Sequence, residues 1–150
     1  MVKLIDYINV EKVTIDILKD YRDQIWKAEN SGRKLKEIDE QMSSLKCALN
    51  TVAVQGGGNK HEEMLCGGID RKTVVEYGYL QAKQYVKEFM PCWKRLTEDE
   101  QYLLTNRFID NAGGEKAGMK KIMERYSISR SEAYRRADLA LKRFSKLLFW

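Results

Sequence analysis

Basic side chains gather near one end of the chain, in the stretch "SISRSEAYRRADLALKRF" (residues 127–144). From Met119 to Lys146 there are nine Lys or Arg and three Asp or Glu, whereas the rest of the 150 residues hold 18 basic and 19 acidic side chains. A positive field confined to one segment is typical of nucleic-acid binding, although an anionic membrane or an acidic protein would also be attracted to it. The charge therefore predicts a polyanionic partner without naming it.

The spacing within this stretch predicts a helix that presents its polar side chains on one face. Ser129 and Glu132 have the spacing of a capping box, so the helix should begin at Arg130. One face is apolar and should be core: it holds Ala133, Ala137, Ala140, Leu141, Phe144 and Leu148. The opposite side holds Arg130, Ser131, Tyr134, Arg135, Asp138 and Lys142, with Arg136 and Arg143 on its flanks. Such a helix start suits the major groove, because arginine bonds guanine through two hydrogen bonds and the flanking cations hold phosphates.

Two further helices are predicted just before it. "LTEDEQYLL" begins with Thr97 and Glu100 at capping-box spacing, and Leu103, Leu104 and Phe108 would form the core side of that helix. "NAGGE" should end it. A short helix through Ile122 and Met123 then leads into a turn at residues 126–128.

These motifs resemble a known DNA-binding unit. "LTEDEQYLLTNRF", a glycine-containing loop and "KKIMERYSISRSEAYRRADLALKRF" are similar to the helix-turn-helix of region four in sigma-70-type transcription factors, over about the last 55 residues. The layout of the whole chain is similar to the ArpU and RinA type of late transcriptional regulators of phages of Gram-positive bacteria. The resemblance implies base contacts by Arg130, Ser131, Tyr134 and Arg135, and phosphate contacts by Lys120, Lys121 and Arg125, with Lys142 farther along the helix and nearer the DNA strands.

Three positions depart from the family's pattern. Met123 stands where alanine is usual, Ser127 stands at the usual glycine of the turn, and Arg136 occupies a position that is usually apolar. A positive φ at Ser127 would carry a steric cost. Arg136 would have to extend its charged end back to the surface.

The first third of the chain carries a heptad pattern. Two apolar runs at alternating spacings of three and four contain Leu18, Tyr21, Ile25, Ala28, Gly32 and Leu35, then Ile38, Met42, Leu45, Leu49 and Val52. Near "ENSGRK" the offset between the runs indicates either a stammer in one long helix or the bend of a hairpin. The pattern fits an amphipathic helix packed on its own domain or a self-associating coiled coil, and we expect residues 1–54 to form a helical oligomerisation module.

Glycine interrupts the pattern at residues 55–68, "QGGGNKHEEMLCGG", where we expect a flexible linker. Residues 69–150 would then form the DNA-binding domain, with Asp70 capping a helix that Pro91 ends. With a single proline and abundant helix-forming residues, the chain is predicted to be all-α.

Several classes of function are not indicated. The only histidine lies in the glycine-rich stretch, the three cysteines have no zinc-site spacing, and we find no phosphate-binding loop or nucleophile motif, so we expect no metal, no cofactor and no enzymatic activity. No apolar run is long enough to cross a membrane, which favours a cytoplasmic protein. The resemblance to phage regulators implies a bacterial host cell.

The resemblance implies a homodimeric activator of late genes that binds double-stranded DNA. Because region four of sigma factors also contacts RNA polymerase, the resemblance suggests the polymerase as a further partner. The sequence does not decide whether this chain makes that contact. The alternative is a small terminase subunit, which couples a helix-turn-helix to a ring-forming element for DNA packaging. A dimer would favour the regulator, and a ring would favour packaging.

Overall fold

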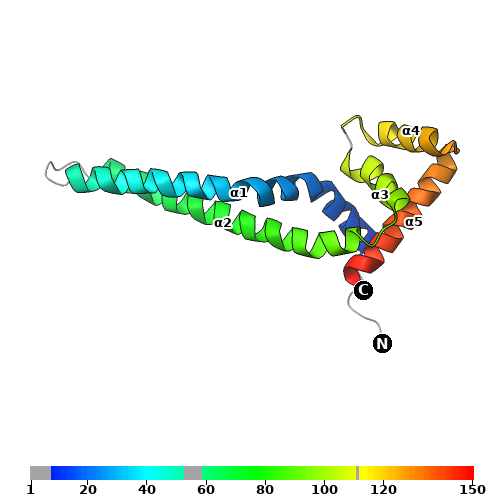
Figure 1. Cartoon of the computed structure of the whole chain (residues 1–150), viewed down its shortest axis with the longest axis horizontal. Helices are drawn as coiled ribbons and strands as arrows, with labels where there is room; N and C mark the ends of the chain where they lie inside the picture. The colour runs from blue at the N-terminus through cyan, green and yellow to red at the C-terminus, as the bar shows by residue number, and fades with distance from the viewer. Residues whose placement is uncertain (1–7, 53–58, 111) are drawn as a thin grey trace. The chain divides into compact units, whose positions relative to one another are not determined.

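The computed structural model describes residues 8–52, 59–110 and 112–150, and the fold is all-α, as predicted (Figure 1). Its elements in chain order are α1 (Val10–Val52), α2 (Asn59–Trp93), α3 (Glu98–Leu104), the π-helical turn η2 (Thr105–Ile109), α4 (Glu115–Tyr126) and α5 (Arg130–Phe149). The described part of the chain contains no strand.

The chain divides into two compact units. Unit 1 combines Met1–Asp23 with Lys87–Trp150, and unit 2 is Gln24–Val86. The predicted division into residues 1–54, 55–68 and 69–150 is therefore not the one that the packing follows. The packing differs from that division because the start of α1 and the end of α2 contribute side chains to the core around α5. Each long helix therefore belongs to both units.

In unit 2, α1 and α2 pack as an antiparallel hairpin. Lys72 Nζ lies 2.7 Å from Asp39 Oδ1, and Met42 Cγ lies 3.3 Å from the position that a Cβ atom would take at Gly68. Residue numbers thus rise along α1 as they fall along α2. Ile38 is only 3% exposed within this hairpin.

Residues of the heptad pattern of α1 thus pack against α2 of the same chain. The helix runs without a break through "ENSGRK", so the pattern describes one long helix and not a hairpin bend at that point. Ile38 and Met42 face α2, which agrees with an amphipathic helix packed on its own chain. The side chains of Leu49 and Val52 lie outside the described part.

The expected linker is helical over most of its length. Residues 59–68 form the first turns of α2, so the prediction of a flexible segment is wrong there, and residues 55–58 lie outside the described residues. Asp70 stands inside the helix and not at its cap, and the helix continues two residues past Pro91. Each interior glycine costs a helix about 1 kcal/mol, a cost that packing on another helix can offset.

An aromatic cluster forms the centre of unit 1. Phe89 lies between Tyr21, Trp93 and Phe144, with ring centroids 5.0, 5.4 and 5.2 Å away. Nearby, Ser145 Oγ is 2.8 Å from Thr14 Oγ1, and both residues are buried. The rings and this polar pair hold the second half of α5 against the start of α1 and the end of α2.

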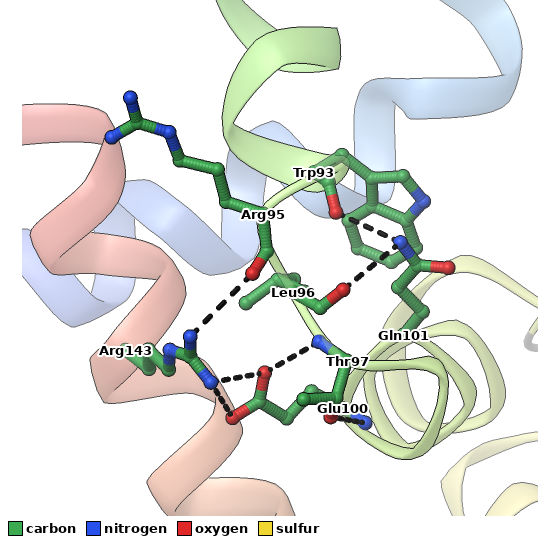
Figure 2. A network of polar contacts seen from close by, with 7 residues as sticks. All are labelled: Trp93, Arg95, Leu96, Thr97, Glu100, Gln101 and Arg143. Carbon is green, nitrogen blue, oxygen red and sulfur yellow. Dashed lines mark hydrogen bonds and ion pairs between the residues drawn. The ribbon is translucent and has the colours of Figure 1, made fainter.

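The start of α3 is fixed by the predicted capping box (Figure 2). Thr97 Oγ1 accepts a hydrogen bond from the Glu100 backbone N–H, and the Glu100 carboxylate accepts one from the Thr97 N–H at 2.9 Å. Arg143 of α5 donates to both oxygens of that carboxylate, at 2.7 and 2.9 Å. Glu100 therefore caps α3 and joins it to α5 at the same time.

Close contact between α4 and η2 depends on one glycine. A Cβ atom at Gly118 would lie 1.9 Å from the Asn106 carbonyl oxygen. Asn106 is itself buried and donates its side-chain amide to the Tyr102 carbonyl at 2.9 Å. Only glycine lets α4 lie this close, and α4 in turn positions the turn that leads into α5.

Candidate nucleic-acid interface

A turn of three residues, 127–129, joins α4 to α5. Ser127 adopts φ 51° and ψ 49°, and the Ile128 N–H donates to the Met123 carbonyl at 3.2 Å. Ser129 Oγ accepts from the Glu132 N–H at 3.3 Å, and α5 begins at Arg130 as predicted. Ser127 is the one described non-glycine residue with positive φ, so this turn has the left-handed residue that the resemblance called for.

The two faces of α5 are as the spacing predicted, except that Leu148 of the expected core face is only half-buried. Ala133, Ala137, Ala140, Leu141 and Phe144 are buried, each no more than 3% exposed. Arg130, Ser131, Arg135, Asp138 and Lys142 are exposed, and Tyr134 is half-buried. Small alanines on the inner face allow close approach to the neighbouring helices while the first turn of α5 remains open to solvent.

A shallow concavity of about 190 Å³ lies between α4 and the start of α5. Its lining combines three cations with an apolar floor: Lys116, Met119, Lys120, Met123, Arg130 and Tyr134. Met123, half-buried, fits at a position where alanine is usual because its flexible side chain lines this hollow. Lys116 was missed by sequence reasoning, although it precedes Lys120 by one helical turn and shares its face.

Glu132 binds two of the arginines of α5. Its carboxylate accepts from Arg135 Nη2 at 2.6 Å and Nε at 2.8 Å, and from Arg136 Nε at 3.0 Å. These hydrogen bonds lower the pKa of Glu132 from 4.5 to about 2 and raise the pKa of Arg135. Arg136 keeps 41% of its side chain exposed, so its charge returns to the surface as expected.

Tyr134 connects the exposed surface with Arg107, a second residue that the sequence analysis did not identify. Its ring centroid lies 5.1 Å from Arg107 Cζ and 5.7 Å from Arg130 Cζ. Arg107 of η2 is 13% exposed and pairs with Asp138 of α5, while its Nε lies 3.5 Å from Glu115 without a hydrogen bond. Arg107 thus ties η2, α4 and α5 together behind the exposed surface.

The remaining basic residues of α4 differ in their surroundings. Lys121 is exposed, and Lys120 lies 4.0 Å from Glu124. Arg125 Cζ stacks 4.0 Å from the Tyr102 ring centroid and so faces α3. Beside it, burial and a 2.7 Å hydrogen bond to Asp99 raise the pKa of Tyr126 to about 12.

Lys142 lies apart from the other predicted contacts. Twelve residues separate it from Arg130, which is roughly 18 Å along a helix axis. It lines a different concavity, of about 250 Å³, with Val10, Glu11, Ser145, Lys146 and Trp150. The structure therefore brings Arg130, Tyr134 and Lys120 together and leaves Lys142 outside their group.

No protein-family model, curated protein or solved structure matches this chain. None of the described helices combines the length and apolar character that a bilayer crossing demands. Within residues 8–52, 59–110 and 112–150 there is no group of three or more His, Cys, Asp or Glu side chains arranged to hold a metal ion.

Proposed function

We propose that this protein binds double-stranded DNA and regulates transcription in a sequence-specific way, with the first two turns of α5 in the major groove. The observation that carries the proposal is the exposed start of α5. It follows a short turn, it is exposed beside a concavity edged by Lys116, Lys120 and Arg130, and its inner face holds buried alanines. An exposed, cationic helix start packed on its own domain suits groove binding.

Arg130 is the strongest candidate for a base contact. It is exposed, and among the described residues no acidic side chain forms an ion pair with it. Arg135 is also exposed but is held by Glu132 in a two-bond contact. It contacts a base only after leaving Glu132, or it acts from the paired position as part of the surface charge.

Phosphate contacts are assigned to Lys120, Lys121 and the newly found Lys116. All three are exposed on α4, and ammonium groups bind phosphates as point charges without reading sequence. Arg125 is assigned a lesser part, because its guanidinium stacks on Tyr102.

The proposal is tested by two substitutions on two DNAs. Duplexes selected by the purified protein from genomic fragments serve as cognate DNA, and a scrambled duplex of equal length serves as random DNA. Arg130→Ala should cost on the order of 1–3 kcal/mol on the cognate duplex and much less on the random one. Lys120→Ala should weaken both duplexes alike and reduce the slope of log affinity against log salt by about one.

The control is Lys36→Ala, which removes an exposed charge from α1. It should leave both affinities unchanged. If Arg130→Ala weakens both duplexes equally while Lys120→Ala affects only the cognate one, α5 does not read the groove as proposed.

A further inference from the structure

One face of α2 in unit 2 is apolar and uncovered. Val74, Tyr77 and Leu80 are 71%, 64% and 65% exposed, and Ile69 is 47% exposed. Single exposed apolar residues are ordinary, but four on neighbouring turns of one helix form a patch of the kind that marks an interface.

Tyr77 and Leu80 of this patch belong to a second pattern on α2, and Ile69 and Val74 flank it. The pattern that faces α1 runs at spacings of three and four through Lys72, Val75, Tyr79, Ala82 and Val86, none of which is exposed. Two residues out of step with it runs another, equally regular: Asp70, Thr73, Tyr77, Leu80, Gln84 and Lys87, all of which are exposed. A helix with two such patterns on opposite sides is built to pack on two neighbours. In this chain α1 covers the first.

The charges along the exposed pattern are complementary to those of a second copy of the same helix. Asp70 stands at one end and Lys87 at the other, and the positions between them, 73, 77, 80 and 84, carry no charge. When two copies of α2 align antiparallel, Asp70 meets Lys87, Thr73 meets Gln84, and Tyr77 meets Leu80 of the second copy.

We propose that α2 packs antiparallel on α2 of a second copy of this chain, about a two-fold axis between residues 78 and 79. The occupant is a second copy because every position finds its complement within the same six residues, as an isologous interface requires. Two hairpins joined in this way form a four-helix bundle. A parallel pairing would instead place Asp70 on Asp70 and Lys87 on Lys87, and like charges facing each other are destabilising.

This inference does not rest on DNA binding. It moves the expected dimer contact from the pattern on α1, in which Ile38 and Met42 face α2, to the outward face of α2. Because its test needs no DNA, a negative result here leaves the proposed function standing, and the reverse also holds.

The first experiment measures the mass of the full chain in solution by sedimentation velocity. The parent should be a dimer, and Tyr77→Asp and Leu80→Asp should each shift it to a monomer over a range of micromolar concentrations. Both side chains are exposed, so the helical circular dichroism of the variants should equal that of the parent. Lys36→Glu on α1 is the matched control and should remain a dimer. A parent that is a monomer, or a dimer that keeps its mass in both variants, would overturn the proposal.

The second experiment tests the antiparallel alignment by exchanging charges. Asp70→Lys places two lysines together at each end of the interface, and Lys87→Asp places two aspartates together, so each single variant should weaken the dimer at least tenfold. The double variant Asp70→Lys/Lys87→Asp restores opposite charges and should regain the parent's dissociation constant. If the double variant is as weak as the two singles combined, the copies are not aligned as proposed.

Discussion

At the scale of single residues, identical substitutions should have opposite effects at two glycines. Gly118→Ala would push a methyl group into the Asn106 carbonyl, 1.9 Å away, so we expect it to destabilise the protein by about 1–3 kcal/mol or more. Gly32 lies inside α1 with no atom within 4 Å of the added Cβ, so Gly32→Ala should stabilise it by about 0.5–1 kcal/mol. Urea unfolding followed by circular dichroism measures both, and equal effects of the two changes would contradict the packing of α4 on η2.

Ionisation of the Glu132 carboxylate should contribute to the stability of the fold as the pH is lowered. Its pKa is lowered to about 2 from 4.5 by hydrogen bonds from Arg135 and Arg136, so folding favours its charged form. The stabilisation is complete above about pH 4.5 and is lost as the pH falls towards 2. Glu132→Gln keeps the size of the side chain but cannot titrate.

Melting temperatures measured from pH 6 to pH 2 should therefore fall less steeply for Glu132→Gln than for the parent. The effect will be small, because the group lies at the surface where water and salt weaken ion pairs. Parallel curves for the two proteins would show that Glu132 titrates normally and that the contacts with the arginines are not kept in solution.

Local residue patterns predicted which residues lie on the polar face of α5. They did not predict the contacts of that face with residues of other elements. The start at Arg130, the buried alanines and the exposed arginines all follow from spacing along one helix. The contact between Glu132 and Arg135 is also local, at i and i+3, and the sequence carried that signal. Arg107 could not have been found in this way, because its partners Asp138 and Glu115 lie on two other elements.

At the scale of elements, the capping box of α3 carries a definite share of stability. Thr97→Ala removes the acceptor for the Glu100 N–H and should cost about 1 kcal/mol, whereas Thr97→Ser keeps the hydroxyl and should cost far less. Chemical unfolding of the two variants gives the comparison. If alanine and serine are equal, the box seen in Figure 2 contributes nothing in solution.

The glycine-rich segment shows where element prediction failed. Five glycines in residues 55–68 favour a loop on local propensity, yet residues 59–68 continue the helix that packs on α1. Gly68 lies against Met42, so a small residue there serves the contact between helices. Packing against α1 outweighed the low helix propensity of glycine in this segment. The local amino-acid sequence does not show that contact, because its partner lies on another helix.

At the scale of the whole molecule, we assign separate tasks to two surfaces. The first is the α4 and α5 surface around Arg130, to which we assign DNA, and the second is the outward face of α2, to which we assign a second copy. Nine of the 27 basic residues lie between Met119 and Lys146, so the positive field is centred on the first surface. Positions 73, 77, 80 and 84 on the outward face of α2 carry no charge, which suits the second surface.

DNA binding by the α4 and α5 surface is tested most directly by lysine footprinting, in which acetylation rates are measured by mass spectrometry with and without a DNA duplex. Lys116 and Lys120 edge the concavity beside Arg130, and Lys36 lies on α1 as an internal control. We expect DNA to slow the acetylation of Lys116 and Lys120 several-fold and to leave that of Lys36 unchanged. Protection of Lys36 with no change at Lys116 and Lys120, or no protection at any lysine under conditions where the DNA is bound, would contradict this expectation.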